Sequence, residues 1–264
     1  MKRKIGFFLT AVVTWMVMAS AGFAAVSVPG DWIGMNDPSI MGWATGWKDY
    51  NVGTHVDAGW QTPDKALGKA VGSSYDIVSL GRGGSITLTF DTPIANGGGA
   101  DFAIFENSFS DTFLELAYVE VSSNGTDFVR FDNWSATPSP VSAYGNVDPN
   151  AVYQLAGKHK QGRGTLFDLD MLQYNQSGDS SILDLENIWF IRLVDIIGDG
   201  TYQDSWGNVI YDPYPTTGSA GFDLDAVAVL NQGAAPPVPT PLPGGILLLG
   251  SGILGLAGLR RKHS

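Results

Sequence analysis

The sequence contains no cysteine and only three histidines. Without cysteine, neither disulfides nor thiolate metal sites can stabilise the fold. The motifs HExxH, GxSxG and GxxxxGK[ST] are also absent. The sequence therefore lacks the usual evidence for a zinc hydrolase, for a serine hydrolase with a nucleophile elbow and for a phosphate-binding loop. We therefore expect a protein that is not an enzyme. Two alternatives stay open: a carbohydrate-active enzyme, either a glycoside hydrolase or a lyase, that uses a pair of carboxylates, and a purely structural matrix protein.

Basic residues are scarce in the central part of the chain. The whole sequence has 15 basic and 26 acidic residues, and six of the basic ones lie in residues 1–25 and 232–264, which hold no acidic residue. The central segment therefore carries 15 − 6 = 9 basic residues and a net charge of 9 − 26 = −17. Such a surface excludes nucleic acid as a partner and favours cations. Few lysines and glutamates beside 34 glycines argue against a helical bundle and for strands joined by tight turns.

The first 24 residues have the pattern of a secretory signal peptide. Lys2, Arg3 and Lys4 precede an apolar run, which ends in small residues that suit cleavage after Ala21 or Ala24. We expect a signal helix here and an exported mature protein.

The other end of the chain is apolar and then basic. Residues 232–243 form a proline-rich linker, and residues 244–264 comprise an uncharged apolar run followed at once by Arg260, Arg261 and Lys262. A spanning helix needs about 20 apolar residues, and this run is slightly shorter and rich in glycine. We expect a hydrophobic helix that anchors the tail transiently in the inner membrane, with the basic tail inside.

The order of these C-terminal features resembles the sorting signal of PEP-CTERM proteins. Val238, Pro239, Thr240 and Pro241 occupy the place of the sorting motif, with Thr240 where that motif has Glu. The resemblance implies recognition by a sorting transpeptidase of the exosortase type, cleavage near Pro239 and delivery to the cell surface or extracellular matrix. A plain tail anchor is the alternative.

Residues 26–231 show short strand patterns without long helical periods. Residues 79–91 contain an alternation of apolar and polar residues from 85 to 90, and residues 100–107 indicate a largely buried strand with polar residues at its two ends. Residues 114–134 contain an Asn124-Gly125 turn between two strand patterns, which is typical of a hairpin. Further strand patterns cover residues 152–157, 164–172, 188–196 and 222–230. This spacing predicts an all-β domain, an antiparallel β-sandwich or jelly roll with long loops.

Aspartates and glycines gather between residues 194 and 230, where they favour an oxygen-lined calcium site. The spacing does not fit an EF-hand loop, so such a site must combine several segments. The candidate ligands are Asp195, Asp199, Asp204, Asp212, Asp223 and Asp225, with Asp101, Glu106 and Asn107 at the ends of a predicted strand. The alternative is that these residues are ordinary turn formers whose side chains bond to nearby backbone N–H groups.

Trp43, Trp47 and Trp60 lie in an aromatic N-terminal segment of the predicted domain. A flat indole suits the C–H face of a sugar, so these three are candidate ligand-binding residues, and packing over a sheet is the alternative.

The strand phrases from about Ile40 to Leu230 also resemble a recurrent exported domain of bacterial cell-surface proteins. Among them are DFAIFEN, AYVEVSSNGTDF, VDIIGDG and GFDLDAVAVL. Its outline is similar to galactose-binding and carbohydrate-binding jelly rolls, in which calcium commonly fastens the last strand to a neighbouring loop. The function expected on these grounds is a calcium-stabilised, non-catalytic protein of the cell surface or matrix that acts in adhesion or in binding extracellular polysaccharide.

Overall fold

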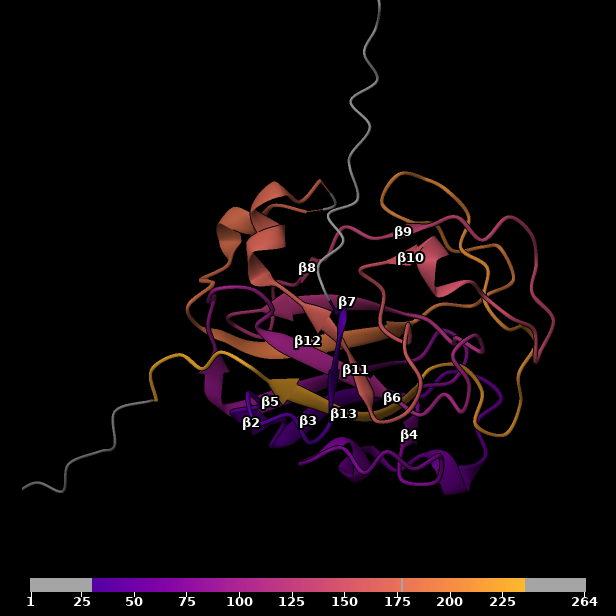
Figure 1. Ribbon diagram of the computed structural model, residues 1–264, viewed down its shortest axis with the longest axis horizontal. Coiled ribbons are helices and arrows are strands. Elements are labelled where there is room, and N and C mark those ends of the chain that lie inside the picture. The colour runs from indigo at the N-terminus through magenta and orange to yellow at the C-terminus, as the bar shows by residue number, and fades with distance from the viewer. Residues whose placement is uncertain (1–29, 177, 236–264) are drawn as a thin grey trace, which may run out of the picture. The chain divides into compact units, whose positions relative to one another are not determined.

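The computed structural model describes residues 30–176 and 178–235 (Figure 1). The predicted signal helix at residues 1–24, the sorting motif at 238–241, the hydrophobic helix from residue 244 and the basic tail all lie outside the described residues. Within the described residues, no helix is long and apolar enough to cross a membrane.

The prediction of an all-β fold is confirmed, because the described residues form antiparallel sheets with only short helices. The first sheet has the strand order β1-β11-β6-β13-β2, and β4 also pairs with β13. Its strands are β1 (Trp32–Gly34), β2 (Gly42–Trp43), β4 (Val78–Ser79), β6 (Phe102–Glu106), β11 (Arg163–Phe167) and β13 (Asp223–Val229).

The second sheet has the order β3-β5-β12-β7-β8, and Figure 1 shows β5, β12 and β7 side by side. Its strands are β3 (Gly46–Asn51), β5 (Ser85–Ile94), β7 (Ala117–Ser122), β8 (Val129–Arg130) and β12 (Ile188–Asp195). The predicted hairpin around Asn124-Gly125 is confirmed, since β7 and β8 pair antiparallel and Gly125 has a φ of 74°.

The remaining elements are short. Strands β9 (Trp134–Ser135) and β10 (Val152–Tyr153) pair with each other. The 3₁₀ helices are η1 (Ala58–Trp60), η2 (Pro63–Ala66), η3 (Pro149–Ala151), η4 (Leu169–Tyr174) and η5 (Ser180–Ile182). Helix η4 corrects the strand predicted through residue 172: the Asp168 carboxylate accepts a hydrogen bond from the Asp170 N–H and caps a helical turn, so β11 ends at Phe167.

The two sheets share one hydrophobic core. Ile86, Leu88 and Leu193 of the second sheet belong to the same buried cluster as Phe102 and Val227 of the first. The Phe102 and Phe167 rings stack within it, with centroids 5.3 Å apart. Alternate residues of strands such as β5 and β6 therefore face the shared core, as period-two sequence patterns require.

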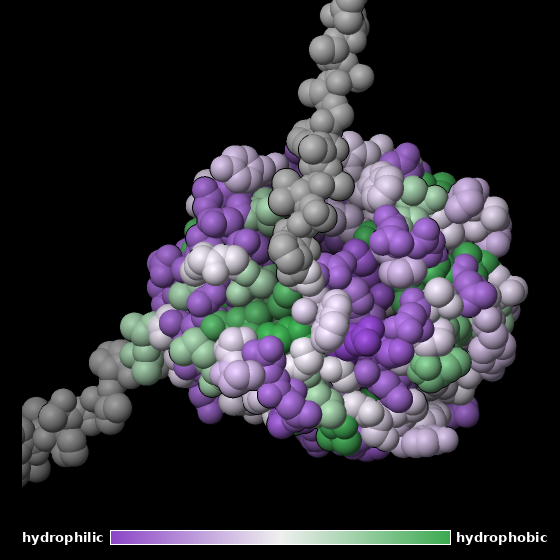
Figure 2. Space-filling view, in the orientation of Figure 1, coloured by the Kyte–Doolittle hydropathy of each residue, from purple (hydrophilic) through white to green (hydrophobic). Residues whose placement is uncertain are grey.

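Two smaller clusters extend the core. One lies on the opposite face of the first sheet, where Ile33, Ala70 and Phe105 pack together with half-buried Trp43. The other joins Leu116 and Tyr118 to Ile196 and Ile210. Figure 2 shows one face of the molecule, on which hydrophilic residues cover much of the surface and hydrophobic residues gather in smaller patches.

Candidate functional site: a buried carboxylate cluster

Three carboxylates meet where strands of the two sheets begin or end. Glu106 is the last residue of β6, Asp223 is the first of β13, and Glu115 lies two residues before β7 of the second sheet. Leu224 pairs with Glu106 across β13 and β6, and Asp223 pairs with Ser79 of β4. We call Glu106, Glu115 and Asp223 the carboxylate cluster.

These carboxylates are almost completely removed from solvent. The exposed fractions are 1% for Glu106, 4% for Glu115 and 2% for Asp223. Glu106 Oε2 accepts a hydrogen bond from the Ser108 N–H at 2.8 Å, and Asp223 Oδ2 accepts one from Asn107 Nδ2 at 3.3 Å. Asn107 therefore belongs to the same site.

One oxygen of each carboxylate is buried without a hydrogen bond of normal geometry from a described residue: Glu106 Oε1, Glu115 Oε1 and Asp223 Oδ1. The hydroxyls of Ser79 and Ser219 near Asp223 and of Thr216 near Glu115 give only weaker contacts. A buried acceptor without a donor costs about 1–3 kcal/mol, and more when it is charged. A proton or a cation would relieve this cost.

The electrostatics of the cluster lead to the same requirement. Burial raises the pKa of Glu106 and Glu115 well above its usual value, and the neighbouring charge of Asp223 raises each further. Burial likewise raises the pKa of Asp223 to about 7. None of the three forms an ion pair with a basic side chain of the described residues.

Two further candidates, Asp195 and Asp212, extend this acidic region. Burial raises the pKa of Asp195 to about 7, and burial together with the Asp195 charge raises that of Asp212 well above its usual value. Their oxygens have backbone donors, however. Asp195 accepts from the N–H groups of Gly83 at 2.8 Å and Phe222 at 2.7 Å, and Asp212 accepts from that of Leu116 at 2.9 Å.

The structure places the other candidate aspartates in separate, hydrogen-bonded positions. Asp101 accepts from the Gly97 and Leu169 N–H groups and from Asn231, and Asp204 accepts from the N–H groups of Ser135, Trp206 and Asn208. The exposed Asp199 binds Thr201 within its own turn. These carboxylates have the contacts expected of turn formers.

Asp223 and Asp225 have different partners although both lie in β13. A register shift between Leu224 and Ala226 interrupts the alternation of the strand. The Asp225 carboxylate consequently accepts from the N–H groups of Val71 at 3.0 Å and Gly72 at 2.8 Å. Of the nine candidates, the structure thus brings Glu106, Asn107 and Asp223 together.

Glu115 is the member of the cluster that sequence reasoning missed. It lies between Leu114 and Leu116, both fully buried, and leads directly into the buried strand β7. A glutamate between two leucines before a hydrophobic strand is the signal that could have identified it, because its neighbours leave the side chain little access to water.

As it stands, no group of three or more His, Cys, Asp or Glu side chains within the described residues is arranged to hold a metal ion. Calcium takes about 6 to 8 oxygen ligands, including backbone and amide carbonyls and water, so it does not require three carboxylates. The free oxygens of the cluster are of the hard type that calcium or magnesium prefers, and no soft ligand is among them.

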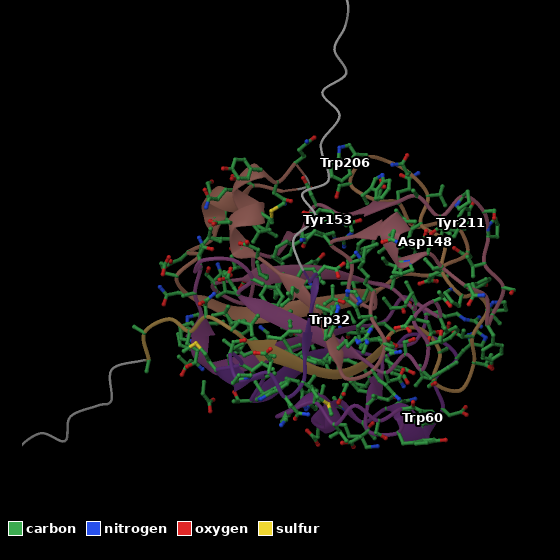
Figure 3. The ribbon with its side chains drawn as sticks, in the orientation of Figure 1. Trp32, Trp60, Asp148, Tyr153, Trp206 and Tyr211 are labelled. Atoms are coloured by element: carbon green, nitrogen blue, oxygen red, sulfur yellow. The ribbon has the colours of Figure 1, made fainter. Side chains whose placement is uncertain are left out.

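The three candidate tryptophans have packing partners. The Trp43 ring lies 5.5 Å from Phe105, Trp47 Nε1 donates to Asp64 at 2.7 Å, and Trp60 stacks on Tyr75 with centroids 6.2 Å apart. Figure 3 shows Trp60 at the opposite side of the view from the exposed Trp206, so these two rings do not form one platform.

Because comparisons with known proteins found no match, the functional proposals rest on the geometry of the site and on the sequence. No protein-family model matches the chain, and no curated protein matches its sequence.

Proposed function

We propose that the protein is an exported, non-catalytic β-sandwich of the cell surface or extracellular matrix, stabilised by calcium, that acts in adhesion or polysaccharide binding. The observation that carries the proposal is the carboxylate cluster, in which Glu106, Glu115 and Asp223 are buried with one unpartnered oxygen each. At the near-neutral pH outside a cell, a divalent cation relieves both the missing hydrogen bonds and the mutual repulsion of these groups.

The position of the cluster fits a structural role for the ion. Glu106 ends β6, Asp223 begins β13, and Glu115 lies before β7 of the other sheet. A cation bound by part of the cluster, with backbone carbonyls and water as its other ligands, would therefore stabilise the contact between both sheets, in a chain that has no cysteine for disulfides. An ion bound only by the folded form, at a hundred times its Kd, adds about 2.7 kcal/mol to the free energy of unfolding.

The strand connections support a jelly roll as the specific type of sandwich. Strands β4, β5, β6 and β7 lie alternately in the first and second sheets, and β11, β12 and β13 alternate again. Two interleaved sets of this kind are characteristic of double-sheet jelly rolls, a fold that lectins and viral capsid proteins share. The fold alone does not determine the function.

The proposed route to the cell surface depends on the two terminal signals. The signal pattern of residues 1–24 supports export, and the PEP-CTERM-like tail supports sorting by an exosortase-type transpeptidase through a transient inner-membrane anchor.

The arrangement of the carboxylates favours binding over catalysis. A glycosidase needs two carboxylates in a cleft, one of them with a raised pKa. Neither Glu106 nor Glu115 lines either of the two cavities on the outer face of the second sheet. Of the carboxylates that do, Glu120 binds two arginines, Asp204 accepts from three backbone N–H groups and Asp49 pairs with Lys48.

The direct test is a calorimetric titration of calcium into the purified full-length protein at pH 7.5 in chelator-treated buffer. The expected result is saturable binding that the double substitution of Glu106→Gln and Asp223→Asn abolishes. Magnesium and sodium serve as competing cations. Absence of any saturable divalent binding would refute the cation site.

A further inference from the structure

A row of charged side chains crosses the outer face of the second sheet. The register places Lys48 of β3 beside Thr87 of β5, Thr87 beside Arg192 of β12, Arg192 beside Glu120 of β7, and Glu120 beside Arg130 of β8. The inward neighbours of these residues, such as Leu88, Ile191 and Val121, belong to the shared core, so the row lies on the opposite face. It contains three cations and one anion in a central segment with a net charge of −17.

Glu120 holds the two arginines in fixed positions. Its Oε1 accepts from Arg130 Nε at 3.0 Å and Nη2 at 2.8 Å, and its Oε2 accepts from Arg192 Nε at 2.5 Å. Glu120 is 6% exposed, whereas about a third of each arginine side chain remains exposed. Neither Nη1 group donates to a described residue, so each guanidinium keeps donors for an external acceptor.

Aromatic rings support the guanidinium planes. Arg130 lies 3.8 Å from the Tyr118 ring centroid and Arg192 lies 3.9 Å from that of Phe128. These contacts, together with Glu120, limit the rotamers of both arginines, so less conformational entropy is lost when they bind a ligand.

Two cavities adjoin the row. One of about 450 Å³ is lined by Arg130 and Arg192, by the carboxylates of Asp49 and Glu120, and by polar residues that include Asn51 and Ser85. The other, of about 300 Å³, lies between Arg130 and the segment around Gln203, which includes the buried Asp204. Glu120 and Arg130 line both, so the two form one groove, and its volume is within the range of small-ligand sites.

We propose that this groove binds an acidic polysaccharide, with a uronic-acid carboxylate bound by Arg130 and Arg192. A guanidinium presents planar paired donors that match a carboxylate, and charge-assisted hydrogen bonds of this type are about twice as strong as neutral ones. The Asn51 and Ser85 side chains supply neutral partners for sugar hydroxyls. This inference deepens the proposed polysaccharide-binding role and rests on it, but it does not depend on the cation site.

The negative charge of the rest of the protein does not prevent this contact. At physiological ionic strength the Debye length is about 8 Å, so a sugar in the groove interacts mainly with the arginines that it touches.

The test is a calorimetric titration of the purified full-length protein with tetragalacturonate, and with cellotetraose as the neutral tetrasaccharide, both at about 0.15 M salt. The acidic oligomer should bind at least about tenfold more tightly than the neutral one. R130Q and R192Q should each weaken it at least about fivefold. The matched control is R163Q, because Arg163 has a similar side-chain exposure of 38% and stacks on Trp32 outside the groove; its affinity should stay within about twofold.

Arg192→Lys provides the variant that keeps the charge beside Glu120 if the glutamine variants do not fold. It should retain the fold, with its melting temperature as the check, and still weaken the acidic oligomer because the planar fork is lost. Binding of cellotetraose alone would refute the acidic specificity and leave the polysaccharide-binding role intact. Binding of neither oligomer would overturn both, and an unchanged affinity of R192K and R130Q would refute the assignment to this groove.

Discussion

At the scale of single residues, the unusual feature of this protein is a set of buried acids that lack basic partners. Several other carboxylates of the described residues accept backbone hydrogen bonds, as Asp204 does within its turn and Asp225 does from β13. Glu106, Glu115 and Asp223 instead retain one unpartnered oxygen each. Their protonation and their occupancy by a cation are therefore linked equilibria.

Glu115→Gln is expected to have opposite effects with and without calcium. In chelator at pH 8 the amide removes a charge from the cluster, so the free energy of unfolding should rise by about 1–3 kcal/mol. In calcium, the variant should lose most of the stabilisation that the ion gives the unmodified protein. Thermal unfolding in both buffers measures the two effects.

The matched control for that substitution is Glu186→Gln, the same chemical change at an exposed glutamate. Its melting temperature should equal that of the unmodified protein in each buffer, since surface substitutions usually change stability by less than about 0.5 kcal/mol. A Glu115→Gln protein with an undiminished calcium response would contradict the role of Glu115.

The pH dependence of the metal-free protein follows from the raised pKa values. Asp195 and Asp223 have a pKa of about 7 in the folded protein against a usual value of 3.8, so the folded state binds protons more tightly than the unfolded chain does. Their stabilising contribution is full below about pH 4 and is lost as the pH rises towards 7, by up to about 1.4 kcal/mol per pH unit for each group.

Melting temperatures in chelator should accordingly fall from pH 5 to pH 8, and calcium should reduce the fall because it replaces the protons. Carboxylates with a lowered pKa, such as those of Asp31 and Asp111, act in the opposite direction but titrate below this range. A metal-free protein that becomes more stable between pH 5 and pH 8 would contradict the raised pKa values of Asp195 and Asp223.

At the scale of elements, the loop that precedes β11 is packed closely against the chain before β7. Gly157 has a φ of 88°, and a Cβ at this position would lie 1.9 Å from the Glu115 backbone oxygen. Gly157→Ala should therefore lower the free energy of unfolding by about 3 kcal/mol or more, measured by denaturant unfolding.

The loss expected for Gly157→Ala has two causes, backbone strain at a positive φ and crowding against the Glu115 backbone oxygen. Gly99→Ala separates them. Gly99 has a φ of 89° but no heavy atom within 4 Å of an added Cβ, so only the backbone strain remains. A loss of about 1 kcal/mol is expected. Equal losses for the two variants would show that crowding against Glu115 contributes nothing.

Strands were predictable from the sequence where the pattern is strict. The alternation of Ile86 and Leu88 with Ser85 and Thr87 predicted β5, and the Asn124-Gly125 turn predicted the β7–β8 hairpin. The Asp168 cap that ends β11 was missed because a strand pattern does not reveal which aspartate will bond to its own backbone.

The site was less predictable than the strands. Local sequence placed Asp223 and Glu106 at strand ends, but their proximity depends on the antiparallel register of β6 and β13, which joins residues far apart in the chain. The arginine row was missed for the same reason, since Arg130 and Arg192 meet only through Glu120 of the strand between them.

At the scale of the whole molecule, the two proposals place two distinct binding regions on one disulfide-free sandwich. The proposed ion would be held by the carboxylate cluster and would stabilise the fold, and the proposed glycan would bind in the groove on the second sheet. Substitutions in the carboxylate cluster should therefore change the calcium-dependent stability without changing glycan affinity, and substitutions of the groove arginines should do the reverse.

The sorting tail gives a prediction in the producing cell. Deleting residues 236–264 should abolish the membrane-bound precursor, because the proposed hydrophobic anchor and the Val238–Pro241 motif are removed together. Cell fractionation followed by immunoblotting measures the change against the full chain. A truncated protein that still fractionates with the inner membrane would contradict the anchor.

The most direct test of the central claim is the melting temperature of the purified full-length protein at pH 7.5, in excess chelator and in millimolar calcium. The account predicts a rise of at least about 5 °C in calcium, from a gain of about 2–3 kcal/mol in a domain of this size. Identical melting temperatures in the two buffers would contradict the claim that a cation neutralises Glu106, Glu115 and Asp223.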